Sequence, residues 1–243
     1  MRFDLSDFSL VDMLQCGRGI RAAAAGAESV RDAAQSVVEF LYKECGHPNA
    51  ARSCALVRFY KTFSFSALEP RLQSFAAKQL PGPPPPLMKC LTLLASIGQE
   101  QAWNDPRQSV GHQTIPLPSA KIVEGAPMIA QLIREMGLDI ADVITPDPAV
   151  LHDRVGKSYN VFHVEKALGS PFIPAQAEFV ERYGVRSVLG FGGLLAGGDL
   201  FAVIMFSRGR IPAESALRFR SIALDVKAVI HPLALEESKR QTG

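Results

Sequence analysis

Two strand-length apolar segments near the C-terminal end limit the architecture more than any other part of the sequence. They are Val185–Leu195 and Leu200–Phe206, and two of the four residues that separate them are glycines. Glycine supplies the positive φ angles that a tight hairpin turn requires. The pattern therefore predicts an antiparallel hairpin. Pro212 then begins a predicted helix that runs to about His231, where Pro232 ends it.

The remaining sequence alternates between helical and strand patterns. Apolar residues recur at i, i+3 and i+4 spacing through residues 28–45, which indicates an amphipathic helix. Aromatic and branched residues are dense in residues 53–64, which is typical of a strand. By the same criteria, the further predicted helices are 8–25, 68–80, 119–136 and 174–183, and the further predicted strands are 88–97, 110–116 and 159–164. Pro127 is expected to break the helix in which it lies, and residues 138–157 are expected to be irregular.

The order of these elements predicts the fold class. Helices and strands are mixed, and a hairpin and a helix close the chain, which favours an α+β fold with a central antiparallel sheet flanked by helices. The first helix is expected to form an N-terminal helical extension. The proline-rich segment Leu80–Met88 cannot hold ladder hydrogen bonds, so it is predicted to be an extended connector. Because this segment interrupts the order of the strands and does not separate two cores, we expect one enlarged domain.

The charge and the apolar patterning argue against two broad classes of function. The 243 residues contain 26 Lys and Arg against 24 Asp and Glu, a formal net charge of +2, so they offer no surplus of cations for phosphate-driven nucleic-acid binding. The longest apolar runs are strand-length, whereas a membrane helix needs about 20 apolar residues. Asp4 and Asp7 stand where a secretory signal carries positive charge. We expect a soluble, cytoplasmic protein that binds neither nucleic acid nor membrane.

Sequence motifs with known chemistry are incomplete. Gly190–Gly193 begins like a dinucleotide-binding fingerprint, but Leu195 stands at the position of its last glycine, and a strand continues where a helix should start. Gly156 lacks the glycine five positions earlier that a phosphate loop requires, because that residue is Leu151. The sequence contains no nucleophile elbow and no HExxH pattern. It therefore identifies no catalytic residue and no cofactor.

Residues Tyr183–Ile230 resemble the C-terminal half of a GAF domain. In that family a strand that begins with an xGIRS pattern leads into a hairpin, and a long helix follows the returning strand. Gly184–Ser187 corresponds to the strand start, Asp199–Ser207 to the returning strand and Ala213–Ile230 to the closing helix. The likeness is to the sensory modules that precede histidine kinase or phosphatase outputs in bacterial signal-transduction proteins.

The resemblance implies a fold, a domain plan and a function. The fold is GAF/PAS-like. The plan is an N-terminal helical extension over residues 1–26, a GAF-like domain over 27–233 with an enlarged middle segment over 81–148, and a polar tail over 234–243. GAF modules of this kind bind small molecules in a cleft over the sheet. The resemblance therefore implies a sensory domain that binds a small-molecule ligand, forms a homodimer through its terminal helices and acts on a kinase or phosphatase partner.

Six residues are candidates for the ligand site. Trp103, the only tryptophan, stands among polar neighbours, which suits a surface position or the lid of a pocket. Arg186 offers a contact for an anion, although an arginine here also has a structural interpretation, in which it holds the strand start by binding backbone carbonyls or a carboxylate. The full candidate set is Trp103, His112, Phe162, His163, Arg186 and Phe191.

Two other functions stay open from the sequence. A redox enzyme, or a haem or metal sensor, on the same scaffold would use Cys90, His112 or His163, provided that neighbouring strands bring them to one cleft. In the redox version Cys90 and Cys54 would form a nucleophile and its resolving thiol. The four cysteines include no CxxC pair, so inert buried thiols are the alternative. In the second function, side chains fill the cleft and the chain is a ligand-free protein interaction module.

Overall fold

The computed structural model describes residues 3–47, 53–146, 160–195 and 197–242. Its helices are α1 (Leu10–Ala23), α2 (Val30–Glu44), α3 (Pro70–Ala77), α4 (Ala120–Glu124), α5 (Pro127–Glu135), α6 (Ile140–Ile144) and α8 (Ala213–Thr242). Its strands are β1 (Phe3–Asp4), β2 (Cys45–Gly46), β3 (Cys54–Ser64), β4 (Lys89–Gly98), β5 (Thr114–Leu117), β6 (Phe162–Val164), β7 (Ser187–Leu194) and β8 (Leu200–Ser207). The short helical turns are η1 (Phe65–Ala67), η2 (Gln101–Asn104), η3 (Pro106–Gln108) and η4 (Gln176–Glu181).

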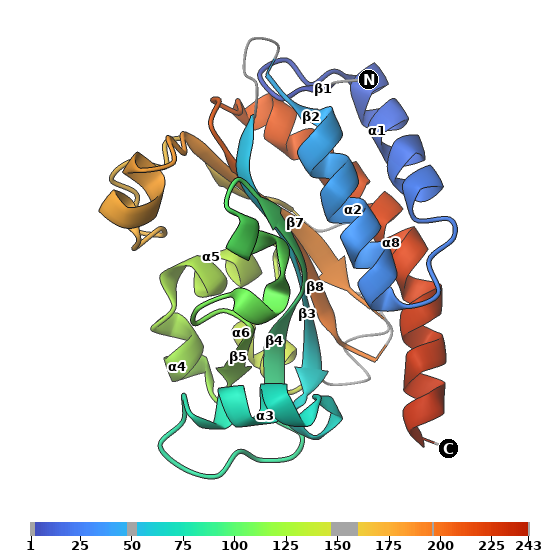
Figure 1. The fold of residues 1–243 in the computed structure, drawn as a ribbon, viewed down its shortest axis with the longest axis vertical. Coiled ribbons are helices and arrows are strands. Elements are labelled where there is room, and N and C mark those ends of the chain that lie inside the picture. The colour runs from blue at the N-terminus through green and yellow to red at the C-terminus, as the bar shows by residue number, and fades with distance from the viewer. Residues whose placement is uncertain (1–2, 48–52, 147–159, 196, 243) are drawn as a thin grey trace.

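Six strands form one sheet in the order β5-β4-β3-β8-β7-β6 (Figure 1). Every neighbouring pair in this sheet is antiparallel. β1 and β2 form a separate parallel pair beside α1. The predicted fold class is therefore confirmed: the protein is α+β, with a central antiparallel sheet flanked by helices.

The C-terminal hairpin forms as predicted, because its glycines meet two separate requirements. Gly197 and Gly198 have φ angles of 89° and 81°, which residues with a Cβ rarely adopt. Gly192 approaches β8 so closely that an added Cβ would stand 2.0 Å from the carbonyl oxygen of Phe201. The glycine-rich segment therefore serves the hairpin.

Helices cover both faces of the sheet (Figure 1). On one side, α2 packs on β3 and β4, α8 packs on β7, and α1 packs on α8; we call this side the α8 face. The other side carries α4, α5 and α6, and we call it the α5 face. Strand side chains alternate between the two cores. On β8, Val203 and Met205 enter the core on the α8 face, whereas Ile204 and Phe206 enter the core on the α5 face.

The prediction that Pro232 ends the last helix is wrong. α8 continues for ten residues beyond it, although a proline inside a helix removes one backbone hydrogen bond and costs about 3 kcal/mol or more. Tertiary contacts beyond the proline offset this cost. Leu233 and Ala234 pack against the core on the α8 face, and Glu237 accepts a 3.0 Å hydrogen bond from the backbone N–H of Val30.

The prediction of irregular structure over residues 138–157 is wrong in its first part. α6 forms there because Ile140 and Val143 are buried in the core on the α5 face. The part of this segment from residue 147 onward lies outside the described residues, as does the predicted strand start at Tyr159.

The other helices follow the sequence closely. The break at Pro127 is confirmed, since α4 ends three residues before it and α5 begins at it. The proposed domain boundaries after residues 26 and 233 stay predictions, and the second falls within α8. Among the described residues, no helix combines the length and the apolar character that crossing a bilayer requires.

Candidate functional site

The middle of β3 presents a charged side chain to the α5 face. Alternation along the strand directs Leu56, Arg58 and Tyr60 to this face. The register of β3 with β8 sets Arg58 beside Ile204 and Leu56 beside Phe206. An arginine therefore stands between apolar and aromatic neighbours on this side of the sheet.

Two adjoining cavities lie over these residues. Their volumes are about 360 Å³ and about 240 Å³. They share the lining residues Tyr60, His112, Met128, Pro174 and Ile204. We call the pair the sheet cavity. Its walls come from the segment between β4 and β5, the start of α5 and the segment that leads into η4, so elements far apart in the sequence build it together.

The Arg58 guanidinium has only neutral partners in the described part of the chain. Its Nη1 donates to the Tyr60 hydroxyl at 3.2 Å, and its Nη2 donates to the Ser109 hydroxyl at 3.2 Å. Its Nε is buried and has no hydrogen-bond partner. No Asp or Glu is found among the described residues that line either cavity. Within the described residues, the positive charge therefore faces the sheet cavity without a counter-ion.

His112 lies near Arg58 on the cavity wall. Its Nδ1 is 3.0 Å from the Val110 carbonyl oxygen, an arrangement in which Nδ1 carries the proton of the neutral ring and Nε2 is an acceptor. Loss of hydration lowers the pKa of His112, and the charge of Arg58 lowers it further, while the hydrogen bond to Val110 opposes both effects. The imidazole is therefore neutral near pH 7.

Trp103 forms one wall of the cavity and is carried by η2. Its indole packs edge-on against Phe179 and Tyr183, with ring centroids 5.7 Å and 4.6 Å away. Gly98 makes room for it, since a Cβ there would stand 2.7 Å from the indole Cε3 atom. The Gly98 N–H also donates to Asn104 Oδ1 at 2.7 Å, which ties η2 to the end of β4. The only tryptophan is thereby held in the cavity wall.

The structure brings two of the six candidate residues together in the sheet cavity, Trp103 and His112. Phe162 faces the same side of the sheet but lines neither cavity. It is buried in the core, with its ring centroid 6.3 Å from that of Phe172. Whether Trp103 and His112 contact a ligand stays a prediction.

His163 and Phe191 lie on the opposite side, the α8 face. Nε2 of His163 is 2.8 Å from the Ile211 carbonyl oxygen. Phe191 is fully buried against Phe219, with ring centroids 5.2 Å apart. Strand alternation decides both positions, since Leu189, two residues from Phe191 on β7, faces this side and is the register partner of His163. These two residues therefore do not share the sheet cavity with the other candidates.

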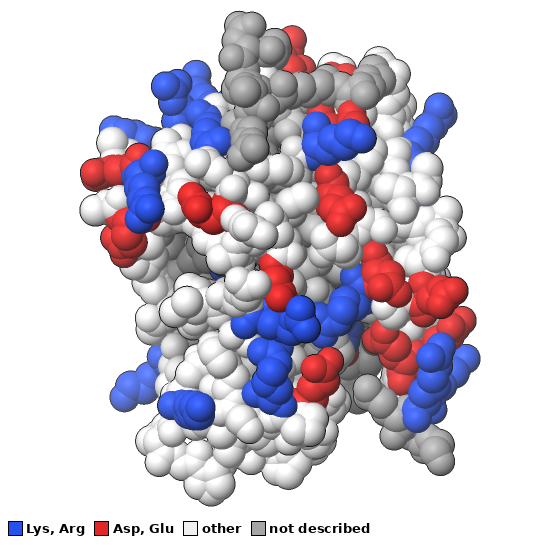
Figure 2. Space-filling model, in the orientation of Figure 1, with Lys and Arg blue, Asp and Glu red and all other residues white. Residues whose placement is uncertain are grey.

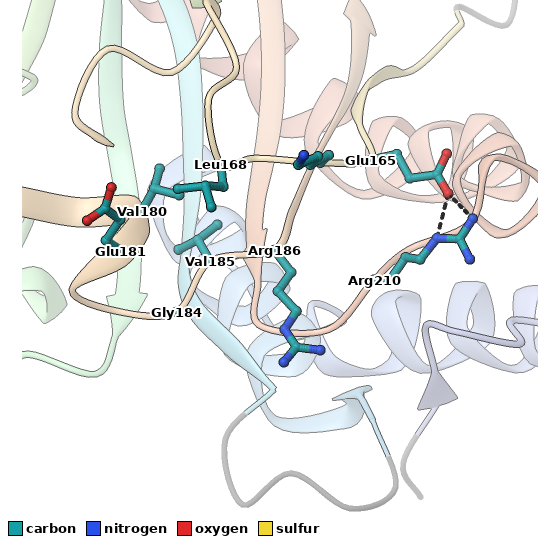
Figure 3. A pocket seen from close by; sticks show the side chains of 9 residues that line it. Glu165, Leu168, Val180, Glu181, Gly184, Val185, Arg186 and Arg210 are labelled. Carbon is teal, nitrogen blue, oxygen red and sulfur yellow. Dashed lines mark hydrogen bonds and ion pairs between the residues drawn. The ribbon is translucent and has the colours of Figure 1, made fainter. Parts of the chain in front are cut away.

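Arg186 lies at a separate surface hollow of about 620 Å³ (Figure 3). In the figure its side chain points away from those of Leu168 and Val185, which also line the hollow. Arg210 Nε donates to Glu165 Oε1 at 2.6 Å, so these two charges at the hollow are paired. Leu168 is 52% exposed. An anion contact at Arg186 stays a prediction.

The residues of the redox and metal interpretations lie apart. Cys90 on β4 and His163 on β6 are separated by four strand spacings, about 19 Å. Cys90 pairs with Phe63, nine residues along β3 from Cys54, which separates the two thiols by about 30 Å. The suggested pair of nucleophile and resolving thiol is therefore wrong. Burial raises the pKa of Cys90 to about 11. Within the described ranges, no group of three or more His, Cys, Asp or Glu side chains is arranged to hold a metal ion.

Sequence reasoning misses four polar residues of the described cavity lining: Arg58, Tyr60, Gln108 and Ser109. A signal for the first two is present, since the period of two along a strand puts Arg58 and Tyr60 on one face with Leu56. Ser109 carries no such signal. It follows η3 in a connecting segment, and only the folding of that segment over the sheet brings its hydroxyl to Arg58.

The chain is similar to several solved structures, whereas no protein-family model and no curated protein sequence matches it. The GAF domain of a phosphoenolpyruvate-protein phosphotransferase from Coxiella burnetii has 13% identity and a TM-score of 0.49, over 94% of this chain and 98% of that one. The free methionine-R-sulfoxide reductase from Neisseria meningitidis has 10% identity and a TM-score of 0.49, over 93% and 92%. CepR2 from Burkholderia cenocepacia, an N-acylhomoserine lactone-dependent LuxR family transcription factor, has 12% identity and a TM-score of 0.43, over 93% and 96%. Similarity at this level carries no argument about function.

Proposed function

We propose that this chain is a sensory or regulatory domain that binds a small organic molecule in the sheet cavity. The composition of the cavity carries the proposal. Apolar and aromatic walls surround a few convergent polar groups, those of Arg58, Tyr60, Ser109 and His112. Binding sites for small molecules commonly combine an apolar lining, which supplies affinity, with a few polar groups that orient the ligand.

Native mass spectrometry of the protein purified from its host, together with an absorption spectrum, tests the proposal. We expect one small molecule bound to each chain and released on denaturation. Trp103 provides a second readout, because the only tryptophan lies in the cavity wall and its emission should shift when the cavity is filled.

A cavity-filling variant locates the bound molecule. Met128→Phe adds bulk where the two cavities meet and should abolish both the bound mass and the emission shift. Leu87→Phe is the matched control, since Leu87 is exposed and lines neither cavity. A chain that carries no small molecule, and whose Trp103 emission responds to no ligand, would favour the ligand-free interaction module.

We also propose that the domain dimerises through α1 and α8. These neighbouring helices expose the apolar residues Leu10, Val11, Leu14, Leu217 and Leu224, with exposed fractions of 61, 60, 59, 48 and 43%. Exposed apolar patches of this kind suit burial against another protein surface. In a sensor, helices at such an interface can convey ligand occupancy to an output by changing their mutual packing, and a histidine kinase or phosphatase would be that output.

Sedimentation analysis tests the dimer. The wild-type protein should sediment as a dimer, and Leu14→Glu should shift it toward the monomer. Leu87→Glu is the control, since Leu87 is 79% exposed but lies in the proline-rich segment between α3 and β4. A wild-type protein that stays monomeric at high concentration would refute this part of the proposal.

A further inference from the structure

We infer that the sheet cavity selects an organic anion, a carboxylate on a compact apolar body, and that the carboxylate binds the Arg58 guanidinium. This inference rests on the proposed function and adds the chemical class of the ligand. Four features of the described residues support it: the missing counter-ion of Arg58, the remaining N–H donors of its Nη atoms, the start of α5 and the apolar walls.

Lys61, three residues along β3 from Arg58, is a buried cation that this fold pairs with a carboxylate. Its Nζ is 2.7 Å from the Asp199 carboxylate, which also pairs with Lys89 at 2.8 Å. Arg58 has instead a phenol and a serine hydroxyl as partners. Removing a charge from water is costly unless an opposite charge lies close by. A ligand carboxylate would provide the opposite charge that Asp199 provides for Lys61.

The Arg58 guanidinium also retains donors for such a ligand. Tyr60 and Ser109 each accept from one Nη, so each Nη keeps a second N–H. A guanidinium carries five N–H donors and binds a carboxylate through two parallel hydrogen bonds. The two Nη atoms, which keep these donors, can therefore bind the two oxygens of a ligand carboxylate, whereas the buried Nε is not exposed to the cavity.

The start of α5 adds positive potential at the same cavity. Ala126, Pro127 and Met128, at the start of this nine-residue helix, line the smaller cavity. The N-cap residue, Ala126, provides no side-chain acceptor for the first turn. The N-terminal end of a helix carries partial positive charge, which stabilises an anion nearby. The helix therefore acts in the same direction as Arg58.

The excess of positive charge is confined to the sheet cavity. Figure 2 shows Lys and Arg interspersed with Asp and Glu on the face in view, and the net charge of the whole chain is only +2. The described lining of the sheet cavity, in contrast, contains one arginine and no carboxylate. A single guanidinium matches a monoanion better than a polyanion such as a nucleotide, which requires several cations for its phosphates.

The remaining walls specify the body of the ligand. Trp103, Phe179, Ile204 and Phe206 present apolar and aromatic surface around Arg58. The larger cavity has a volume of about 360 Å³, which is within the size range of small-molecule sites. The favoured ligand therefore has a charged end at Arg58 and an aromatic or short aliphatic body against Trp103.

Calorimetric titration of the full chain with matched acids and amides tests this inference. The probes are phenylacetate, cinnamate and octanoate, each compared with its primary amide. We expect the acid of at least one pair to bind about tenfold or more tightly than its amide. The reason is that a hydrogen bond between a guanidinium and a carboxylate, both charged, is stronger than one between a guanidinium and a neutral amide. Arg58→Gln should remove this preference. Arg58→Lys should keep part of it, since a lysine is a point charge without the fork of donors.

Arg107→Gln is the matched control, because Arg107 is exposed, pairs with Asp105 at 2.9 Å and does not line the sheet cavity. It should leave the preference unchanged, and melting curves should show that all three variants are folded. Equal affinities for acids and amides, or no binding of any acid at millimolar concentration, would overturn the inference. A neutral molecule found in the host-purified protein would also overturn it, while the proposed binding function would stand.

Discussion

Replacing Asp199 with Asn should destabilise the protein, because it removes the carboxylate that Lys61 and Lys89 share. The Lys61 side chain is 5% exposed and that of Asp199 is 25% exposed, so water screens this pair only weakly. Breaking a buried ion pair while leaving its partner costs about 3–5 kcal/mol. We expect the lower end, about 3 kcal/mol, because Asp199 is partly hydrated. For a chain of this length, that corresponds to a melting temperature lower by roughly 6–12 °C.

The pH dependence provides a sharper test. Burial alone would raise the pKa of Asp199, but Lys61 and Lys89 outweigh it and hold the pKa below its ordinary value. A carboxyl whose pKa is lower in the folded state stabilises that state above its unfolded pKa of about 3.9, and the stabilisation is lost as the pH falls through the folded value. The difference between wild type and Asp199→Asn should therefore be constant at neutral pH and shrink below about pH 4.

Denaturant unfolding, followed by circular dichroism, measures both quantities. Glu124→Gln is the control, since Glu124 pairs with Arg134 at 2.9 Å but both side chains are about half exposed. Exposed pairs contribute about 0–1 kcal/mol, so the control should stay close to wild type. An Asp199→Asn protein as stable as the control at neutral pH would refute the reasoning.

Four further outcomes are expected. Phe191→Ala should lower the free energy of unfolding by about 3–5 kcal/mol without changing ligand affinity, because Phe191 is buried on the α8 face; calorimetry of the folded variant would show any affinity change. Gly192→Ala should prevent the β7–β8 pairing and yield insoluble protein, since the new Cβ would meet a backbone oxygen at 2.0 Å. In thiol titration at pH 8, Cys90 should react only on unfolding, because its pKa is about 11. Carboxylate binding should tighten as the pH falls from about 8 to about 6, because a bound anion beside His112 would raise its pKa, which loss of hydration and the charge of Arg58 lower in the protein alone. Among the described residues, Arg58 and Tyr60 are the other charged or titratable groups that line the cavity, and His112→Asn should abolish the effect.

Local patterns predicted most of the secondary structure. The amphipathic repeat of residues 28–45 became α2, and the apolar segments around Gly197 and Gly198 became the β7–β8 hairpin. The failures occurred where distant contacts outweighed a local signal. Pro232 did not end α8 because residues beyond it pack on the core and on the start of α2.

The site was harder to predict than the fold. His163 and Phe191 were expected in the pocket, yet strand register and alternation send both to the α8 face. The same alternation brings Arg58 to the α5 face, and it can be read from the sequence once β3 is recognised. Which of the two faces carries the cavity cannot be read in this way, because it depends on where the segment between β4 and β5 folds.

The distance along the sequence over which an interaction acts decides whether the sequence alone can predict its result. Helix periodicity, proline breaks and glycine turns act over a few residues, so the amino-acid order alone establishes the antiparallel hairpin, the helices and the mixed architecture. The sheet cavity depends on contacts between residues about fifty to a hundred and fifty positions apart, since Arg58 meets Ser109 and lies beside Ile204. Such contacts depend on strand order and on how the covering segments close over the sheet, and these emerge when the complete core packs.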